Sequence, residues 1–482
     1  MTLTFLGAAR TVTGSKYLLK TNDASVLIDC GLFQGLKELR QRNWAQFHMN
    51  PADVDAVVLT HAHLDHCGYL PRLAAQGFKG RVFCTAGTQD LCRIVLPDSG
   101  RIQEEDAENA NRGHYSTHAP ALPLYTEADA FRALSLLQPV GYDRPMPVAP
   151  GIEVDFINAG HLLGSAYARV RTNGKTILFG GDLGRFGRPV LPDPTMVSEA
   201  DYLLVESTYG NRIHEKDDEG EKLAGVIRDA ADRGGRIIVP AFAIGRVEEI
   251  IYWIKRLEEK RRIPVLPVFV DSPMALEALA RYTERINELD RELNPEQEDE
   301  KAPHGPADRD EPLERRRSHA RAERQVCAFC TERFRAIGST QESKQLTHSK
   351  QPAIIISASG MATGGRVLHH LKAALPDTRN TVLFVGYQAV GTRGRRLIEG
   401  ERAVKIHGQF VPVNAHVDLI ESMSAHADSL EIMRWLGGFK RPPQQTFIVH
   451  GEPQAMEALA GSIQTKLGWA TKMPQQAETF AL

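Results

Sequence analysis

Short runs of apolar, mainly β-branched residues recur along the chain, and most end in a turn that contains Gly, Ser or His. The clearest runs cover residues 54–59, 176–179, 202–205, 237–239, 265–270, 354–356, 382–385 and 447–449. Several lead into segments with helical periodicity, which lie at 247–257, 275–286 and 366–374. Continuous apolar strands that alternate with helices predict an α/β protein with buried sheets. In such sheets, binding and catalytic residues tend to follow the carboxyl ends of strands.

The length and composition predict a soluble protein of more than one domain. A chain of 482 residues is longer than a single ordinary core requires, and it is 42% hydrophobic and 24% charged. No segment approaches the ~18 apolar residues that suggest a membrane span. The chain begins without the basic leader and apolar run of a signal peptide, and its six cysteines are scattered. We therefore expect a cytoplasmic protein with no membrane partner.

The net charge and the charged segments are less informative about function than the pattern of apolar runs. The formal net charge of −2 argues against a protein that is positive over its whole surface, but nucleic acid can still bind a local basic groove. The segment 287–324 is dense in Glu, Asp, Arg and Pro and is expected to be a solvated surface insertion. The alternative is that its arginines, at 315–317 and 321–324, contact a phosphate backbone. Cys327 and Cys330 form a lone CxxC pair, which we expect to be ordinary cysteines because no second pair completes a zinc site.

The strongest chemical signal follows the predicted strand at 54–60. The six residues 61–66 read His-Ala-His-Leu-Asp-His. Residues two apart in an extended segment point the same way, so His61 and His63 can share one ion. Asp65 and His66 can face a second ion where the chain turns towards a helix. Three imidazoles and a carboxylate at this density suit a borderline cation such as zinc.

Three further residues follow strands in the same way and could complete the site. His161 comes after the run 152–157, Asp182 follows Gly180 and Gly181, and His450 comes after the run 447–449. The glycines allow the short Asp182 side chain to approach two ions, which its carboxylate can bridge. Each residue alone is a weak signal, because a single His or Asp after a strand is usually structural. Together they predict one site built from strand ends.

In order and setting, these motifs resemble the signature motifs of the metallo-β-lactamase superfamily, together with Asp29 after the run 26–28. The resemblance implies an αββα sandwich with metals at one edge. It implies that one ion is bound by His61, His63 and His161, and the other by Asp65, His66 and His450, with Asp182 between them. Asp29 would orient a ligand, because ligating groups need hydrogen-bonded partners.

Three more segments resemble motifs A, B and C of the β-CASP nucleases. They contain Glu206 in Val-Glu-Ser-Thr-Tyr-Gly, His426 in Ser-Ala-His-Ala-Asp, and His450 in Val-His-Gly-Glu. The resemblance implies an α/β β-CASP domain with a mainly parallel sheet, inserted in the lactamase-like domain. We expect the lactamase-like domain at 1–208 and 396–482, and the β-CASP domain at 209–395.

The identity of the motif C residue bears on the substrate. RNA-cutting members of the family usually carry His at that position and the DNA-repair branch an apolar residue, so His450 favours RNA as the partner. The motif order resembles bacterial relatives of the eukaryotic pre-mRNA 3′-end endonuclease. The sequence leaves open the RNA target and the balance of endonuclease and 5′→3′ exonuclease activity. It also leaves open whether the protein forms a homodimer.

Two Gly-rich turns are candidates for contact with the RNA backbone. Residues 357–365 link a predicted buried strand to a helix, so backbone N–H groups near Ser359, Gly360 and Met361 could receive an anion. The second turn, at 386–396, contributes Arg393. A Gly-rich turn often has only a structural role. With the family resemblance, a structural role and a contact with the RNA backbone are equally favoured.

The expected reaction is hydrolysis of a phosphodiester by hydroxide held on two Zn²⁺ ions, with Mn²⁺ as an alternative metal. His426 would protonate the leaving group, and Glu206 would fix its tautomer. The resemblance implies products with a 5′-phosphate and a 3′-hydroxyl. The competing interpretations are a hydrolase of the same fold that acts on a thioester, lactone or small phosphodiester, a DNA nuclease of the β-CASP group, and a non-catalytic scaffold.

Overall fold

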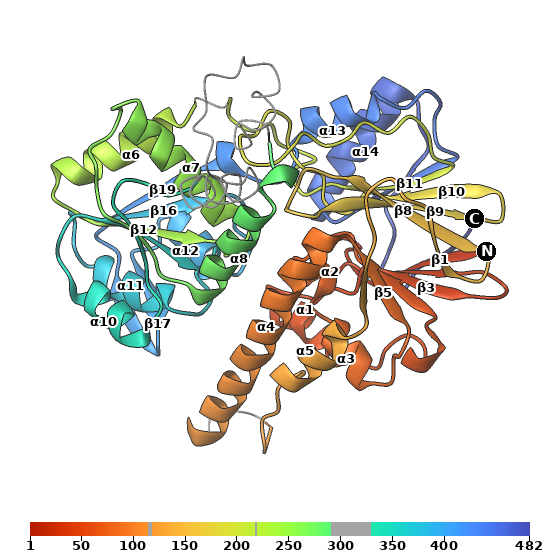
Figure 1. Ribbon diagram of the computed structural model, residues 1–482, viewed down its shortest axis with the longest axis horizontal. Coiled ribbons are helices and arrows are strands. Elements are labelled where there is room, and N and C mark those ends of the chain that lie inside the picture. The colour runs from red at the N-terminus through yellow and green to blue at the C-terminus, as the bar shows by residue number, and fades with distance from the viewer. Residues whose placement is uncertain (114–117, 217–218, 291–328) are drawn as a thin grey trace, which may run out of the picture. The chain divides into compact units, whose positions relative to one another are not determined.

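The computed structural model describes residues 1–113, 118–216, 219–290 and 329–482 (Figure 1). These residues form two compact units. Unit 1 comprises Met1–Phe186, Asp193–Ile213 and His426–Leu482, and unit 2 comprises Gly187–Pro192 and His214–Ala425. Residues 396–425 therefore lie in unit 2, whereas the sequence led us to expect them in the lactamase-like domain. The limits of the two family domains stay a prediction.

Unit 1 contains two seven-stranded sheets. The first has the order β22-β1-β2-β3-β4-β5-β6, with strands β1 (Thr2–Phe5), β2 (Tyr17–Lys20), β3 (Ser25–Ile28), β4 (Ala56–Val58), β5 (Arg81–Cys84), β6 (Leu137–Pro139) and β22 (Thr479–Ala481). The second has the order β21-β20-β11-β10-β9-β8-β7, with strands β7 (Met146–Ala149), β8 (Ile152–Asn158), β9 (Ala166–Thr172), β10 (Lys175–Phe179), β11 (Tyr202–Glu206), β20 (Gln445–Val449) and β21 (Thr471–Lys472). Its helices are α1 (Lys37–Arg42), α2 (Leu64–Cys67), α3 (Leu70–Ala75), α4 (Ala86–Gly113), α5 (Glu127–Leu134), α13 (Ser429–Leu436) and α14 (Pro453–Leu467).

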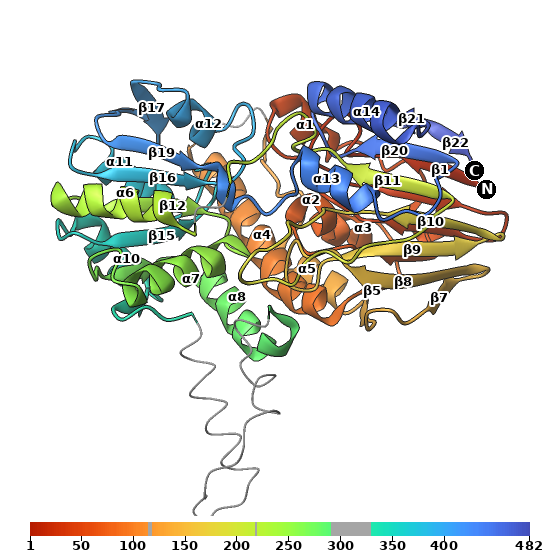
Figure 2. The same ribbon diagram turned by 90° about the horizontal axis from the view of Figure 1, so that it is seen from above.

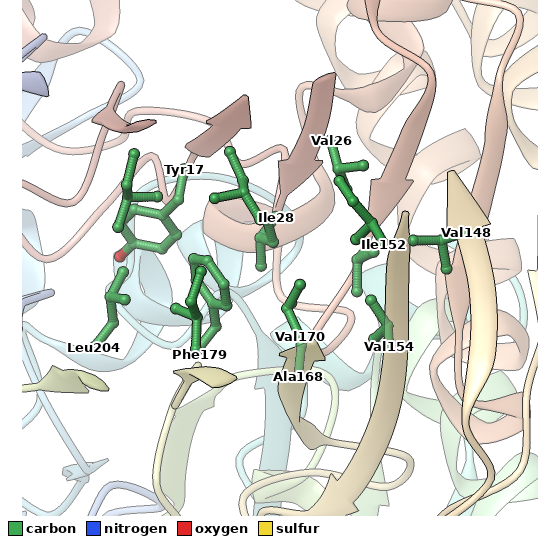
Figure 3. Close-up of a cluster of buried hydrophobic side chains, with 14 of the residues drawn as sticks. Tyr17, Val26, Ile28, Val148, Ile152, Val154, Ala168, Val170, Phe179 and Leu204 are labelled. Atoms are coloured by element: carbon green, nitrogen blue, oxygen red, sulfur yellow. The ribbon is translucent and has the colours of Figure 1, made fainter. Parts of the chain in front are cut away.

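The two sheets pack face to face around a single apolar core. Figure 3 shows Val26 and Ile28 of β3 opposite Val154 of β8 and Val170 of β9. Side chains alternate between the faces of a strand, so Leu27 lies on the other face of β3 and is also fully buried. Burial on both faces requires helices outside each sheet, which explains why these strands are continuous apolar runs.

Helices cover the outer face of the second sheet. Trp435 of α13 and Leu459 of α14 pack in one cluster with Leu203 of β11 and Ile448 of β20. Figure 2 shows α13 and α14 beside these strands, and Figure 1 shows α3, α4 and α5 beside the first sheet. The predicted αββα sandwich is confirmed.

Unit 2 is built on one six-stranded sheet with the order β14-β13-β15-β12-β16-β19, in which all pairings are parallel. Its strands are β12 (Ile237–Ala241), β13 (Val268–Val270), β14 (Phe334–Ala336), β15 (Ile354–Ala358), β16 (Thr381–Val385) and β19 (His416–Ile420), and β17 (Ala403–Ile406) and β18 (Gln409–Pro412) form a separate hairpin. Its helices are α6 (Glu221–Asp232), α7 (Arg246–Glu259), α8 (Pro273–Glu284), α10 (Thr340–His348), α11 (Val367–Ala374) and α12 (Arg393–Ile398). Single 3₁₀ turns lie at Pro51–Asp53 in unit 1 and at Ile286–Glu288 and Glu421–Met423 in unit 2. The predicted parallel α/β domain is confirmed.

The sequence pattern missed the longest helix. α4 has 28 residues and contains Pro97, which lacks an N–H and normally ends or kinks a helix. Its second half is rich in Glu, Asp, Arg and Asn, so it shows little apolar periodicity. The first half is held by burial of Leu91, Val95 and Leu96.

The expectations about a membrane span and about the charged segment depend on which residues the structure describes. No helix within the described residues is long and apolar enough to cross a lipid bilayer. Most of the charged segment 287–324, including its arginine clusters, lies outside the described residues, as does Cys327. The predictions made for these residues stay predictions.

Candidate metal centre

The histidine-rich turn is held by backbone hydrogen bonds to the loop that follows β3 and to the loop that precedes β2. Cys30 N–H donates to the carbonyl of His66 at 2.7 Å, and Ser15 N–H donates to the carbonyl of Asp65 at 2.8 Å. The packing is so close that a Cβ on Gly31 would lie 1.6 Å from the backbone carbonyl oxygen of Asp65. Glycine is therefore required at position 31 for the turn to take this position.

Four side-chain atoms form a first group around the turn. Nδ1 of His63 lies 3.1 Å from Nε2 of His61 and 3.2 Å from Nε2 of His161. Oδ2 of Asp182 lies 3.4 Å from Nε2 of His61 and 3.4 Å from Nε2 of His161. Ligand bonds of ~2.0–2.2 Å in a tetrahedron put neighbouring ligand atoms roughly 3.3–3.6 Å apart. The first group therefore has the spacing of a tetrahedral site.

A second group lies beside the first. Nε2 of His66 lies 3.3 Å from Nε2 of His450, which lies 3.4 Å from Oδ2 of Asp65. The other oxygen of Asp182, Oδ1, lies 3.2 Å from Nε2 of His66. The two oxygens of one carboxylate thus face the two groups.

Asp182 supplies the clearest test of whether the residues fit a cation. It follows β10, and its side chain is 1% exposed. Its Oδ1 atom is buried and makes no hydrogen bond, although Nε2 of His66 lies 3.2 Å away. A buried carboxylate oxygen without a donor is costly unless a cation compensates it. The position is also tight, because a Cβ on Gly181, whose φ is +53°, would lie 2.9 Å from Thr60.

The ionisation of the three histidines in the first group fits the same conclusion. Burial, with the charge of His66, lowers the pKa of His61 to about 3, and burial lowers the pKa of His63 to about 4. Burial also lowers the pKa of His161 well below its usual value. Neutral imidazoles are the form that binds metal. These side chains therefore form a candidate metal site of histidine and aspartate.

Asp29 lies behind the second group and is hydrogen-bonded to His66. Burial alone would lower the pKa of His66, but the charges of Asp182 and Asp29 raise it well above the usual value. Nδ1–H of His66 donates to Oδ2 of Asp29 at 2.7 Å, which turns Nε2 towards the second group. Asp29 also accepts from the N–H and the hydroxyl of Thr60, at 2.8 and 2.9 Å.

Several supporting side chains were absent from the sequence-based prediction. Thr60 contacts Nδ1 of His61 at 3.1 Å, and Thr208 contacts Nδ1 of His450 at 3.1 Å. Ser165 accepts from the N–H of His161 at 3.0 Å. Only Thr60 had a sequence signal, because it stands directly before His61. Ser165 and Thr208 are polar residues in turns, and nothing in the sequence separates them from others.

Glu206 and His426 form a pair beside the ligands. Glu206 ends β11, and its Oε1 accepts Nδ1–H of His426 at 3.0 Å and the N–H of Leu183 at 2.7 Å. Nε2 of His426 lies 3.9 Å from Oδ2 of Asp182. Burial opposes charge on His426, but the carboxylates of Glu206 and Asp182 outweigh it and raise its pKa to about 9.

The Gly-rich turns lie in unit 2. The turn 359–365 follows β15, and Ser359 Oγ lies 2.9 Å from Thr363 Oγ1 within it. The carbonyl of Gly360 accepts from Gln388, and that of Met361 accepts from Gly394 N–H at 3.0 Å. Arg393 begins α12 and donates Nε–H to the carbonyl of Lys405 at 3.0 Å. In the structure these residues join neighbouring loops, and their role in RNA binding stays a prediction.

An αββα sandwich with histidine and aspartate ligands at its strand ends defines a metallo-hydrolase. Three family models match the chain: the metallo-beta-lactamase superfamily at residues 10–84, the Beta-Casp domain at 247–397, and the Zn-dependent metallo-hydrolase RNA specificity domain at 411–474.

Similar proteins cover almost the whole chain. Ribonuclease TTHA0252 of Thermus thermophilus is 36% identical over 454 residues, which are 94% of each chain. Transcription termination factor FttA of Methanocaldococcus jannaschii is 30% identical over 99% of this chain and 71% of its own. A crystal structure of a protein of unknown function from Enterococcus faecalis V583 matches with a TM-score of 0.52 at 13% identity, over 100% of this chain and 99% of its own, and this likeness shows the fold alone. The chain belongs to the β-CASP branch of the metallo-β-lactamase superfamily.

Proposed function

We propose that this protein is a ribonuclease that hydrolyses RNA phosphodiester bonds at a site with two Zn²⁺ ions. The observation that carries the proposal is the position of Asp182, whose two oxygens face two separate groups of histidine ligands at 3.2–3.4 Å. RNA is favoured as the substrate because a relative of almost the same length is named a ribonuclease and a matched family model is described as an RNA specificity domain.

Two metals are proposed because the ligands divide into two sets that share one carboxylate. His61, His63 and His161 would hold one ion. Asp65, His66 and His450 would hold the other. Nitrogen-rich sets with a carboxylate suit zinc, and the same donors accept manganese. Bound ions would lower the pKa of a water towards ~7 and offset the charge that builds on phosphate oxygens.

His426 is the proposed general acid. Its Nδ1–H donates to the buried Glu206, so Nε2 is the atom available for proton exchange. Its side chain keeps 18% exposure, so a substrate can reach it. In hydrolysis the P–O3′ bond breaks, and His426 would give its Nε2 proton to the departing O3′ atom. Water would supply the new oxygen on phosphorus, which leaves a 5′-phosphate and a 3′-hydroxyl.

Glu206 positions this acid. Its Oε1 atom also accepts the N–H of Leu183, and Oε2 accepts the N–H of Thr208 at 3.3 Å, so the carboxylate cannot rotate freely. A fixed carboxylate holds one tautomer of His426 and stabilises its protonated form. The raised pKa of His426, about 9, keeps the imidazole protonated at neutral pH, as a general acid requires.

The proposal is tested by measuring zinc per chain and RNA cleavage on the same preparation. We expect about two zinc ions per chain and cleavage that is lost when a chelator removes them. A preparation that holds both ions and hydrolyses a thioester but not RNA would contradict the assignment of substrate.

A further inference from the structure

A group of basic side chains lies where α11 meets the tip of the β17–β18 hairpin. The ring centres of His369 on α11 and His407 at the tip are 4.6 Å apart, with 40° between the ring planes. Lys372 lies one turn further along α11, on the same side as His369. These three side chains and that of Lys405 are exposed. We call His369, Lys372, Lys405 and His407 the hairpin cluster.

The hairpin presents one face to solvent because its other face is in the core. Val404, Ile406 and Val411 are buried in the core of unit 2. Since side chains alternate along a strand, Lys405 points away from that core. Phe410 is the cross-strand partner of Lys405, and its side chain is 73% exposed. Figure 2 shows β17 beside α12.

The tip of the hairpin is a two-residue turn with both residues at positive φ. Ile406 pairs with Gln409, so His407 and Gly408 form a two-residue turn, with φ of +46° and +79°. Turns with two positive φ angles most often carry Asn or Gly at the first position, and histidine is also among the residues enriched at positive φ.

The hairpin cluster has no paired carboxylate. Among the described residues, no salt bridge includes His369, Lys372, Lys405 or His407. Burial lowers the pKa of His407, and the charges of Lys372 and Arg393 lower it further. Burial likewise lowers the pKa of His369, with a contribution from His407. The lowered pKa values leave both imidazoles mainly neutral at pH 7, so Lys372 and Lys405 carry the positive charge of the cluster, which an anion would complement.

Arg393 makes this surface rigid. Its guanidinium donates to the carbonyl of Lys405 at 3.0 Å and to the carbonyl of Ala362 in the Gly-rich turn. It thereby ties the hairpin to the turn 359–365, while the Lys405 ammonium stays exposed. A preformed surface loses less conformational entropy on binding than mobile loops do.

We propose that the hairpin cluster and Phe410 bind single-stranded RNA, with the cations on phosphates and the phenyl ring stacked on a base. Basic side chains interleaved with an exposed aromatic ring are the usual means of binding single strands. The inference rests on the proposed function only in naming RNA as the polyanion.

The test is equilibrium binding of a fluorescent, phosphorothioate-substituted RNA of about 20 nucleotides to the intact protein over a range of salt concentrations. Removal of two phosphate contacts in the K372A/K405A variant is expected to reduce the slope of log K against log[salt] by ~1.4, because each contact to a single strand contributes ~0.7. Phe410→Ala is expected to weaken binding roughly fivefold or more, at every salt concentration.

Lys350→Ala is the matched control. Lys350 is exposed and lies before the first residue of β15. The Gly-rich turn, which Arg393 ties to the hairpin, follows the last residue of β15. The control therefore lies at the opposite end of this strand. Unchanged affinity and salt slope in K372A/K405A, with a thermal unfolding midpoint equal to that of the parent protein, would overturn the inference. Cleavage of ordinary RNA by the unmodified protein reports the proposed function separately. A protein that binds the oligonucleotide through the cluster but cuts no RNA would refute the function and keep this site.

Discussion

Nδ1 of His426 lies 3.0 Å from Oε1 of Glu206, although 220 positions separate the two residues in the chain. The carboxylate is buried at the end of β11, and the imidazole stands just before α13 with its far nitrogen 3.9 Å from Asp182. The pair therefore holds one exchangeable proton at the border of the metal ligands. The proposed function gives proton delivery and metal binding to different side chains, and variants can separate them.

His426→Ala should slow the chemical step by ~10²–10⁴-fold, because a positioned general acid contributes about that much. Metal content should stay unchanged, since none of the proposed ligand atoms belongs to His426. Single-turnover cleavage beside metal analysis measures both quantities, with His348→Ala on the exposed end of α10 as the control. Loss of metal from the His426 variant would show that this histidine is a ligand.

His63→Ala should abolish cleavage and release metal. Nδ1 of His63 is the atom that lies within 3.1–3.2 Å of both other imidazoles in the first group, so its removal opens that group. Metal content should fall from about two ions towards one, because the second group keeps its own three ligands. Full metal content in this variant, measured after dialysis, would contradict the division of ligands.

Gly31→Ala should disrupt the metal site without altering any ligand. The added methyl group would meet the Asp65 carbonyl at 1.6 Å, so the turn that carries Asp65 and His66 must move. We expect loss of the second metal and of activity, measured by metal titration. Gly225→Ala is the matched control, because no atom lies within 4 Å of its Cβ position on α6, and it should stabilise the protein by ~0.5–1 kcal/mol. A fully active Gly31 variant would argue against a rigid turn.

Asp271→Asn should destabilise unit 2 in a pH-dependent way. Asp271 is buried and accepts from His370 Nε2 at 2.6 Å and from Arg366 at 2.8 Å. Burial would raise its pKa, but the bonds from His370, Ser343 and Arg366 hold the pKa below the usual value. The loss should be about 3 kcal/mol at neutral pH, because one partner of a buried ion pair is removed.

The sign of the pH effect follows from the lowered pKa. The folded state favours the ionised carboxylate, so its contribution is present above the unfolded pKa of ~3.9 and is lost as the pH falls through the folded pKa. Urea unfolding of the parent and the Asn variant should therefore converge below about pH 4. A difference in the free energy of unfolding that is constant from pH 7 to pH 3 would show that the charge of Asp271 is not responsible.

The sequence was most informative where chemistry follows a strand directly. His61, His63, Asp182 and His450 could be selected because each stands at the end of a continuous apolar run. The structure brings their side chains together because β4, β10 and β20 end at one edge of the sandwich. The class of fold could be predicted for the same reason, since buried parallel strands leave an unmistakable apolar pattern.

Features that depend on contacts between distant segments could not be predicted. The hydrogen bond between Thr208 and His450 spans 242 positions, and either residue alone resembles any polar residue in a turn. The hairpin cluster takes its side chains from a helix and a hairpin whose proximity has no local signal. α4 was missed because Pro97 and a polar second half conceal a helix that is held by tertiary packing.

Analysis of the ends produced from a labelled RNA tests the central claim most directly. The account predicts fragments with a 5′-phosphate and a 3′-hydroxyl, because water attacks phosphorus and His426 protonates the departing O3′ atom. Fragments with a 5′-hydroxyl and a 2′,3′-cyclic phosphate would mean that the neighbouring ribose hydroxyl is the nucleophile, and would contradict it.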